Sequence, residues 1–110
     1  MSAKIEFLLK MIDEIENYKV ELGSIEAVLN NKMAFNATLM NLLQIGETLN
    51  KLDEAILKEH GLLEDAKGAY KTRNFIAHDY EGVNKVVIED VLRNHLPRLK
   101  LILQGFANVS

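Results

Sequence analysis

The sequence contains no cysteine and no tryptophan, and it has only one proline and few aromatic residues. Without cysteine the protein can form no disulfide, no thiolate nucleophile and no cysteine-type zinc site, and this composition fits a reducing compartment. No apolar run approaches the length of a membrane span, and the first residues predict an amphipathic helix instead of a signal peptide. We therefore expect a cytoplasmic protein with no membrane association.

Positive charge is also scarce, because 13 Lys and Arg residues stand against 16 Asp and Glu residues, for a formal net charge of -3. This balance argues against broad, charge-driven binding of nucleic acids, so any RNA contact must come from a local patch. Such a protein would need the shape of an RNA such as tRNA, or a partner protein, to select its substrate. The length of 110 residues predicts a single domain over residues 1–110. A domain of this size should have modest stability alone, and association with another chain would increase it.

Strand-like alternation of useful length is absent, and apolar residues recur at helical spacing instead. The first half of the sequence predicts a helix that ends at Gly23, a short helical turn capped by Ser24, and a long helix that ends at Gly61. Gly46 lies on the apolar stripe of the long helix. A missing side chain there would let another helix approach closely.

The second half of the sequence predicts two further helices. One covers residues 62–77 and is followed by a break at residues 81–82. The other begins near Val87 and is interrupted by Pro97, which predicts a kink or two abutting helices at residues 94–96. The expected fold is therefore all-α: an antiparallel four-helix bundle with a short additional helix and a proline-kinked C-terminal helix.

The helix predicted over residues 62–77 carries a charged side chain on its apolar stripe, where the helical spacing puts Arg73. Arginine cannot lose its proton in a protein, so Arg73 must meet carboxylates, phosphates or water there. One interpretation is an internal ion pair with Glu47, which follows Gly46 on the long helix. Composition alone favours this interpretation, because structural ion pairs outnumber catalytic ones.

Around Arg73 the sequence gathers further polar residues that are capable of chemistry: Lys67, Lys71, Asn74, His78 and Tyr80. Lys67 and Lys71 lie one turn apart and form a small basic edge, although a solvated helix face explains them equally well. Taken alone, His78 would be a helix-end histidine that interacts with the macrodipole. An amide, an imidazole and a phenol within eight residues of an arginine instead indicate a site.

Other templates for chemistry are missing. His60 has the position of an ordinary residue at a helix C-terminus, and His95 that of a core or rim histidine between Leu92 and Leu99. No histidine pair has metal-ligand spacing, so the sequence predicts no metal site and no cofactor. It also has no glycine-rich phosphate loop and no serine-containing nucleophile elbow.

The segment Arg73–Tyr80, RNFIAHDY, resembles the Arg-x4-His-x-Tyr signature of HEPN domains, specifically of HepT-type toxins encoded beside minimal nucleotidyltransferases. Residues 41–47 resemble the family's IGE segment, and residues 94–100 resemble its DLPxLK segment. His95 replaces the usual acidic residue of that last segment. The three landmarks occur in the family's order, and the resemblance covers nearly the whole chain.

The resemblance implies a metal-independent endoribonuclease toxin that forms a homodimer, in which the motifs of two protomers face each other. Arg73 and His78 would be its catalytic residues, while Asn74 and Lys71 would position the RNA phosphate. The resemblance also implies that a cognate minimal nucleotidyltransferase, the antitoxin, attaches AMP to Tyr80 and blocks the RNA site.

Two other functions stay open at the level of sequence. The chain would also suit a non-catalytic helical module that binds nucleotide or substrate for a partner nucleotidyltransferase, since an AMP acceptor uses the same motif. A plain structural bundle, in which Arg73 and Glu47 form an internal ion pair, is the third interpretation.

Overall fold

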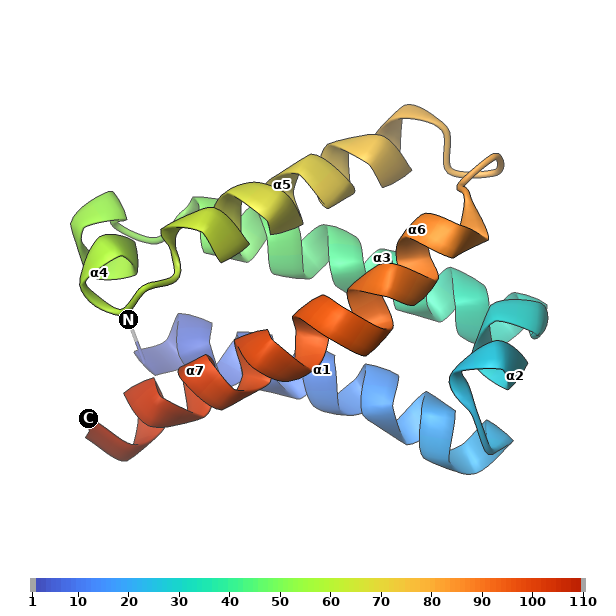
Figure 1. Ribbon diagram of the computed structural model, residues 1–110, viewed down its shortest axis with the longest axis horizontal. Coiled ribbons are helices and arrows are strands. Elements are labelled where there is room, and N and C mark those ends of the chain that lie inside the picture. Colours follow the sequence, from blue (N-terminus) through green and yellow to red (C-terminus); the bar gives the residue numbers. More distant parts are fainter. Residues whose placement is uncertain (1, 110) are drawn as a thin grey trace.

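The computed structural model describes the backbone of residues 2–109 and the side chains of residues 3–106, and over that range it is all-α, as the sequence predicts. Four long arms form the bundle (Figure 1). They are α1 (Ser2–Leu22), α3 (Lys32–Asn50), α5 (Leu63–His78) and a C-terminal arm made of α6 (Lys85–Asp90), the π-helical stretch η1 (Val91–His95) and α7 (Leu96–Val109). The short helices α2 (Ile25–Asn30) and α4 (Glu54–Glu59) lie between arms.

The ends of α1 and α4 follow the predicted stop signals. Gly23 and Gly61 have φ angles of 100° and 70°, a left-handed region that glycine adopts without steric cost. After Gly23, the hydroxyl of Ser24 caps α2 by accepting a hydrogen bond from the amide of Ala27 at 3.0 Å.

The expected long helix up to Gly61 is wrong, because the chain breaks it into α3 and α4. Lys51 and Leu52 form the turn between them, and the side chain of Leu52 is buried there. Asp53 then starts α4, since its carboxylate accepts a hydrogen bond from the amide of Ala55 at 2.8 Å. The burial of Leu52 and the N-cap at Asp53 together favour a break here, although the apolar residues of the sequence continue at helical spacing.

The irregularity predicted around Pro97 is present, but it is a π-helical stretch and not a break between two helices. The amide of Leu96 donates to the carbonyl of Val91, five residues back, so the register widens just before the proline. Pro97 has no amide to donate, and the wider turn is one way for a helix to pass such a residue. The arm therefore continues from α6 into α7 (Figure 1).

Helix α3 packs on both α1 and α5, and α1 also packs on α7. Most of the fully buried side chains of the core are aliphatic, for example those of Leu8, Ile12, Leu39, Leu49, Ile76, Ile88 and Leu103. Asn41 is a buried polar exception, and its amide donates to the carbonyl of Met11 and to the carboxylate of Glu14, each at 3.1 Å. The α3–α5 contact positions the candidate site.

Candidate functional site

The candidate site is built where α5 packs on α3 at Gly46. A Cβ atom on Gly46 would lie 2.6 Å from the carbonyl oxygen of Ala69 and 2.7 Å from the Cβ of Arg73. Only a residue without a side chain therefore permits this approach of the two backbones. The close approach expected at Gly46 is confirmed, and it brings Arg73 of α5 directly beside α3.

Arg73 is half-buried and held by partners on both helices. Its Nε and Nη2 donate to the same carboxylate oxygen of Glu47, at 3.1 and 2.7 Å, and its Nη1 donates to the side-chain oxygen of Asn74 at 3.0 Å. The guanidinium carbon also lies 5.8 Å from the centre of the Tyr70 ring, within range of a cation–π interaction. The ion pair between Arg73 and Glu47 expected from the sequence is therefore present.

The guanidinium of Arg73 retains capacity for a further ligand. Arginine has five N–H donors, and the three hydrogen bonds above use three of them. The remaining N–H groups lie one on each Nη atom. Because only 30% of the Arg73 side chain is exposed, these donors meet less competing solvent than they would on a free surface. A fixed, partly desolvated guanidinium of this kind suits recognition of phosphate.

His78 is the last residue of α5, and its side chain is exposed. In the part of the chain whose side chains are described, its imidazole makes no hydrogen bond. Asn74, one turn earlier, contacts Arg73 instead of His78. His78 thus stands in solvent at the C-terminal end of α5, five residues after the arginine.

The side chain of Tyr80 does not project freely into solvent. Tyr80 is half-buried, and its hydroxyl donates to the backbone carbonyl of Asn36 in α3 at 3.0 Å. The turn that follows α5 explains this position. Asp79 accepts a hydrogen bond from the amide of Gly82 at 3.0 Å, and a Cβ on Gly82 would collide with the same carboxylate. The turn therefore folds tightly and carries Tyr80 back onto α3.

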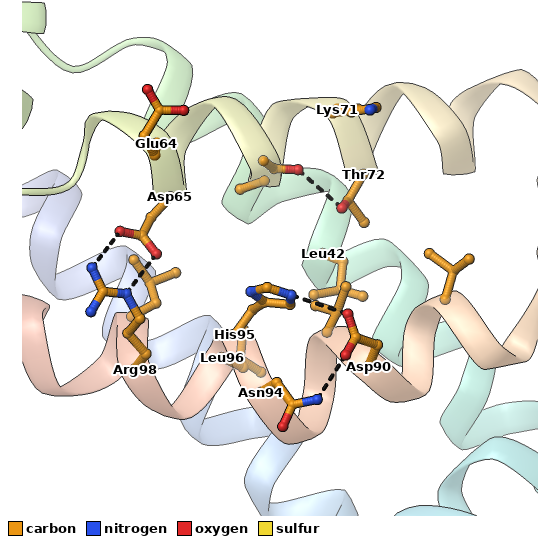
Figure 2. Close-up of a pocket in the computed structure, with 15 residues that line it drawn as sticks. Leu42, Glu64, Asp65, Lys71, Thr72, Asp90, Asn94, His95, Leu96 and Arg98 are labelled. Atoms are coloured by element: carbon orange, nitrogen blue, oxygen red, sulfur yellow. Dashed lines mark hydrogen bonds and ion pairs between the residues drawn. The ribbon is translucent and has the colours of Figure 1, made fainter.

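A groove of about 720 Å³ lies between α5 and the C-terminal arm, and Lys71 is among the residues that line it. Figure 2 shows two polar pairs that reach into it. Arg98 donates from Nε and Nη2 to the carboxylate of Asp65 at 3.2 and 3.3 Å, and so connects α7 with α5. Further along the groove, Asp90 contacts His95 at 3.1 Å. Hydrogen bonds from Asn94 and then from His95 lower the pKa of Asp90 below its usual value of 3.8.

The sequence does not indicate this groove. Periodicity alone places His95 with the buried residues Leu92 and Leu99. In the structure 62% of its side chain is exposed on the groove rim, where its imidazole contacts the carboxylate of Asp90. The π-helical register of residues 91–95 shifts the faces of the arm relative to a regular helix. Pro97 was the available signal, although it predicts an irregularity and not its geometry.

Lys71 is exposed, and no ion pair of Lys71 occurs among the described side chains. The same part of the structure contains no cluster of three His, Asp or Glu residues that could hold a metal ion. None of its helices is both long enough and apolar enough to span a membrane.

A comparison with protein families places these observations in context. The model of one family, described as Ribonuclease HepT-like, matches residues 8–105 of the chain. The match includes the site residues described above: Glu47, Lys71, Arg73, Asn74, His78 and Tyr80. No solved structure matches the chain.

Proposed function

Since this match makes the chain a member of the HepT-like ribonuclease family, we propose that it is a metal-independent endoribonuclease toxin of a toxin–antitoxin pair. Its partner would be a minimal nucleotidyltransferase that silences it by transferring AMP to Tyr80. Family membership supports the ribonuclease activity. The observation that carries the proposal is the fixed guanidinium of Arg73, five residues before an exposed histidine.

Cleavage of RNA needs three groups around one phosphate. A base takes the proton of the 2′-hydroxyl, whose oxygen attacks the phosphorus, while an acid protonates the departing 5′-oxygen. A cation stabilises the negative charge that grows on the phosphate oxygens. We assign the cation to Arg73 and the proton transfers to His78, with Asn74 and Lys71 as positioning groups. The products are a 2′,3′-cyclic phosphate and a free 5′-hydroxyl.

One imidazole cannot easily serve both ends of this in-line reaction, so the mechanism requires two copies of His78. A twofold homodimer provides them, one as the base and the other as the acid, because an imidazole accepts a proton in its neutral form and donates one in its charged form. Met40 supports such an interface. It shares a flank of α3 with Asn36 and Glu47 by helical spacing, and it is a large apolar side chain that is 48% exposed.

Tyr80 is the proposed point of control. Its hydroxyl donates to the Asn36 carbonyl, so the lone pairs of the phenolic oxygen stay available for attack on the α-phosphorus of ATP. The new bond forms as pyrophosphate leaves, and the phenolic proton passes to solvent or to a base of the partner enzyme. An AMP group beside Arg73 would add negative charge and compete with the RNA backbone for the guanidinium.

A second candidate function has its own supporting observation. Glu47 already occupies two donors of Arg73, which would suit a non-catalytic module that binds nucleotide or substrate for a partner nucleotidyltransferase. In that case the motif would only present Tyr80 or a nucleotide to the partner enzyme.

The deciding experiment incubates purified, unmodified protein with end-labelled single-stranded RNA and with tRNA, with and without a chelator. Cleavage that leaves a cyclic phosphate and persists in the chelator supports the ribonuclease. A parallel incubation contains ATP and the partner nucleotidyltransferase instead of RNA. AMP transfer to the protein there, without any RNA cleavage in the first incubation, supports the module. If neither occurs, the plain structural bundle remains.

A further inference from the structure

One face of α5 carries an aligned set of exposed polar side chains: Lys67, Lys71, Asn74 and His78. We call this set the α5 stripe. The residues follow one another at intervals of four, three and four, so at 3.6 residues per turn they share one face of the helix. All four side chains are exposed. The stripe therefore reaches solvent along its whole length and ends at the proposed acid–base residue.

The charge along this part of α5 differs from that of the whole chain. The protein has a net charge of -3, yet the stripe carries two lysines, and residues 66–78 contain no Asp or Glu. Acidic residues lie only at the two ends, with Glu64 and Asp65 before the stripe and Asp79 after it. A local basic surface of this kind is the type of patch through which an acidic protein can still bind RNA.

The lysines of the stripe are not neutralised by firm ion pairs. Lys67 approaches Glu64 only to 4.0 Å, with the two side chains 64% and 88% exposed, and such a pair contributes little. Lys71 has no ion pair among the described side chains. In contrast, the ammonium group of Lys100 on α7 lies 2.6 Å from the carboxylate of Glu16, and the hydrogen bond between them raises the pKa of Lys100. The stripe lysines thus stay available for an external anion.

The stripe is long enough for several nucleotides. Eleven residues separate Lys67 from His78, which corresponds to about 16 Å at about 1.5 Å per residue. A stacked strand advances about 3.4 Å per nucleotide, so a strand laid along the stripe would pass both lysines. Other exposed lysines, such as Lys10 and Lys19 on α1, belong to a different helix and have no such alignment with His78.

We propose that the α5 stripe is the path of the single-stranded RNA substrate, which runs from the scissile phosphate at His78 towards the N-terminus of α5. Lys71 and Lys67 each hold one backbone phosphate along this path. This inference rests on the proposed ribonuclease function. It goes further by stating where the RNA strand lies on the protein surface. Because the contacts go to phosphates, they fix the position of the strand without reading its sequence.

The test measures binding apart from cleavage. A fluorescent 2′-O-methyl oligoribonucleotide lacks the attacking hydroxyl, and its affinity is measured by anisotropy over a range of salt concentrations. The variant Lys67→Ala/Lys71→Ala should bind more weakly. The magnitude of the slope of log K against log salt should fall by about 1.4, because each of the two lost phosphate contacts on a single strand contributes about 0.7. The matched control Lys10→Ala/Lys19→Ala removes the same charge and should retain the parental slope.

The outcomes separate the path from the ribonuclease activity. If both double variants lose affinity and slope equally, only net charge matters and the path is wrong. If the parent cleaves RNA while the stripe variant keeps the parental slope, the path fails and the ribonuclease stands. If the stripe variant alone loses binding but the parent never cleaves RNA, the path stands and the ribonuclease fails. Circular dichroism should show the same helical content in all variants, because the four replaced lysines are exposed.

Discussion

Arg73 and Glu47 are joined by two hydrogen bonds that end on one oxygen, since Nε and Nη2 of the arginine both donate to Oε1 of the glutamate. The second carboxylate oxygen of Glu47 makes no hydrogen bond to Arg73. This geometry differs from the two parallel bonds of a fork–fork pair. It fixes the guanidinium while two N–H groups stay available, so a structural ion pair and a phosphate-binding arginine can be the same residue.

Replacing Glu47 by Ala should lower RNA cleavage by about 10²-fold, because a misplaced catalytic group loses about that much rate. Glu47→Gln, which retains an acceptor oxygen, should stay closer to the parent. The loss of stability should be below about 1 kcal/mol, since 46% of the glutamate side chain is exposed. Single-turnover cleavage and urea unfolding measure the two effects. Faster cleavage by Glu47→Ala would mean that Glu47 competes with the substrate for Arg73.

His78→Ala and Arg73→Ala should each reduce RNA cleavage by about 10²–10⁴-fold and remove any toxicity to growing cells. The exposed position of His78 predicts that its variant keeps the helical fold, as judged by circular dichroism. Adding a chelator to the parent protein should leave cleavage unchanged. If both variants unfold, Arg73 and His78 are structural residues, and if chelation stops cleavage, the metal-free mechanism is wrong.

Gly46→Ala should destabilise the protein by about 1–3 kcal/mol, because its Cβ would meet the backbone of Ala69 and push α5 away from α3. Cleavage should fall as well, since Arg73 moves with α5. The matched control is Gly68→Ala on α5, where an added Cβ has open space and better helix propensity should stabilise by up to about 1 kcal/mol. Urea unfolding compares the two, and equal stability would contradict the close approach of the helices.

Tyr80→Phe should remain an active nuclease and escape AMP transfer, because the ring is retained and only the acceptor oxygen is lost. The variant also loses the hydrogen bond to the Asn36 carbonyl, so its stability should fall by about 0.5–1.5 kcal/mol. Intact mass after incubation with the partner nucleotidyltransferase and ATP provides the measurement. AMP additions of equal size on parent and variant would move the acceptor to Tyr18, Tyr70 or another hydroxyl.

The proposed homodimer should be visible by light scattering at tens of micromolar, an order-of-magnitude concentration for micromolar interfaces. Met40→Asp places a charge on the exposed apolar part of the α3 flank, so it should shift the protein towards monomer and reduce cleavage in parallel. The change Leu101→Asp, at an exposed apolar residue of α7, serves as a comparison for a charge added on another helix. A parent protein that is monomeric yet cleaves RNA would exclude the shared-site mechanism.

The sequence by itself determined the fold class and the polar cluster. Apolar periodicity determined the four long arms, since a helix must bury one stripe whatever its neighbours are. Gly23, Gly61 and Ser24 determined several helix ends, because their conformations and capping bonds are local. The spacing of Arg73 on a buried stripe also required a partner, and Glu47 was the partner predicted and found.

Only the tertiary structure decided how these elements meet. It broke the long helix at Leu52 because that side chain is buried, and it held Tyr80 on Asn36 because a tight turn returns the chain to α3. The same holds for His95, which the π-helical register turns out to a groove rim that no local pattern shows. The positions of Leu52 and Tyr80 depend on contacts with residues far apart in the sequence, and helical period describes only neighbours within a few turns. The position of His95 depends on a π-helical register, which the period of a regular helix does not describe.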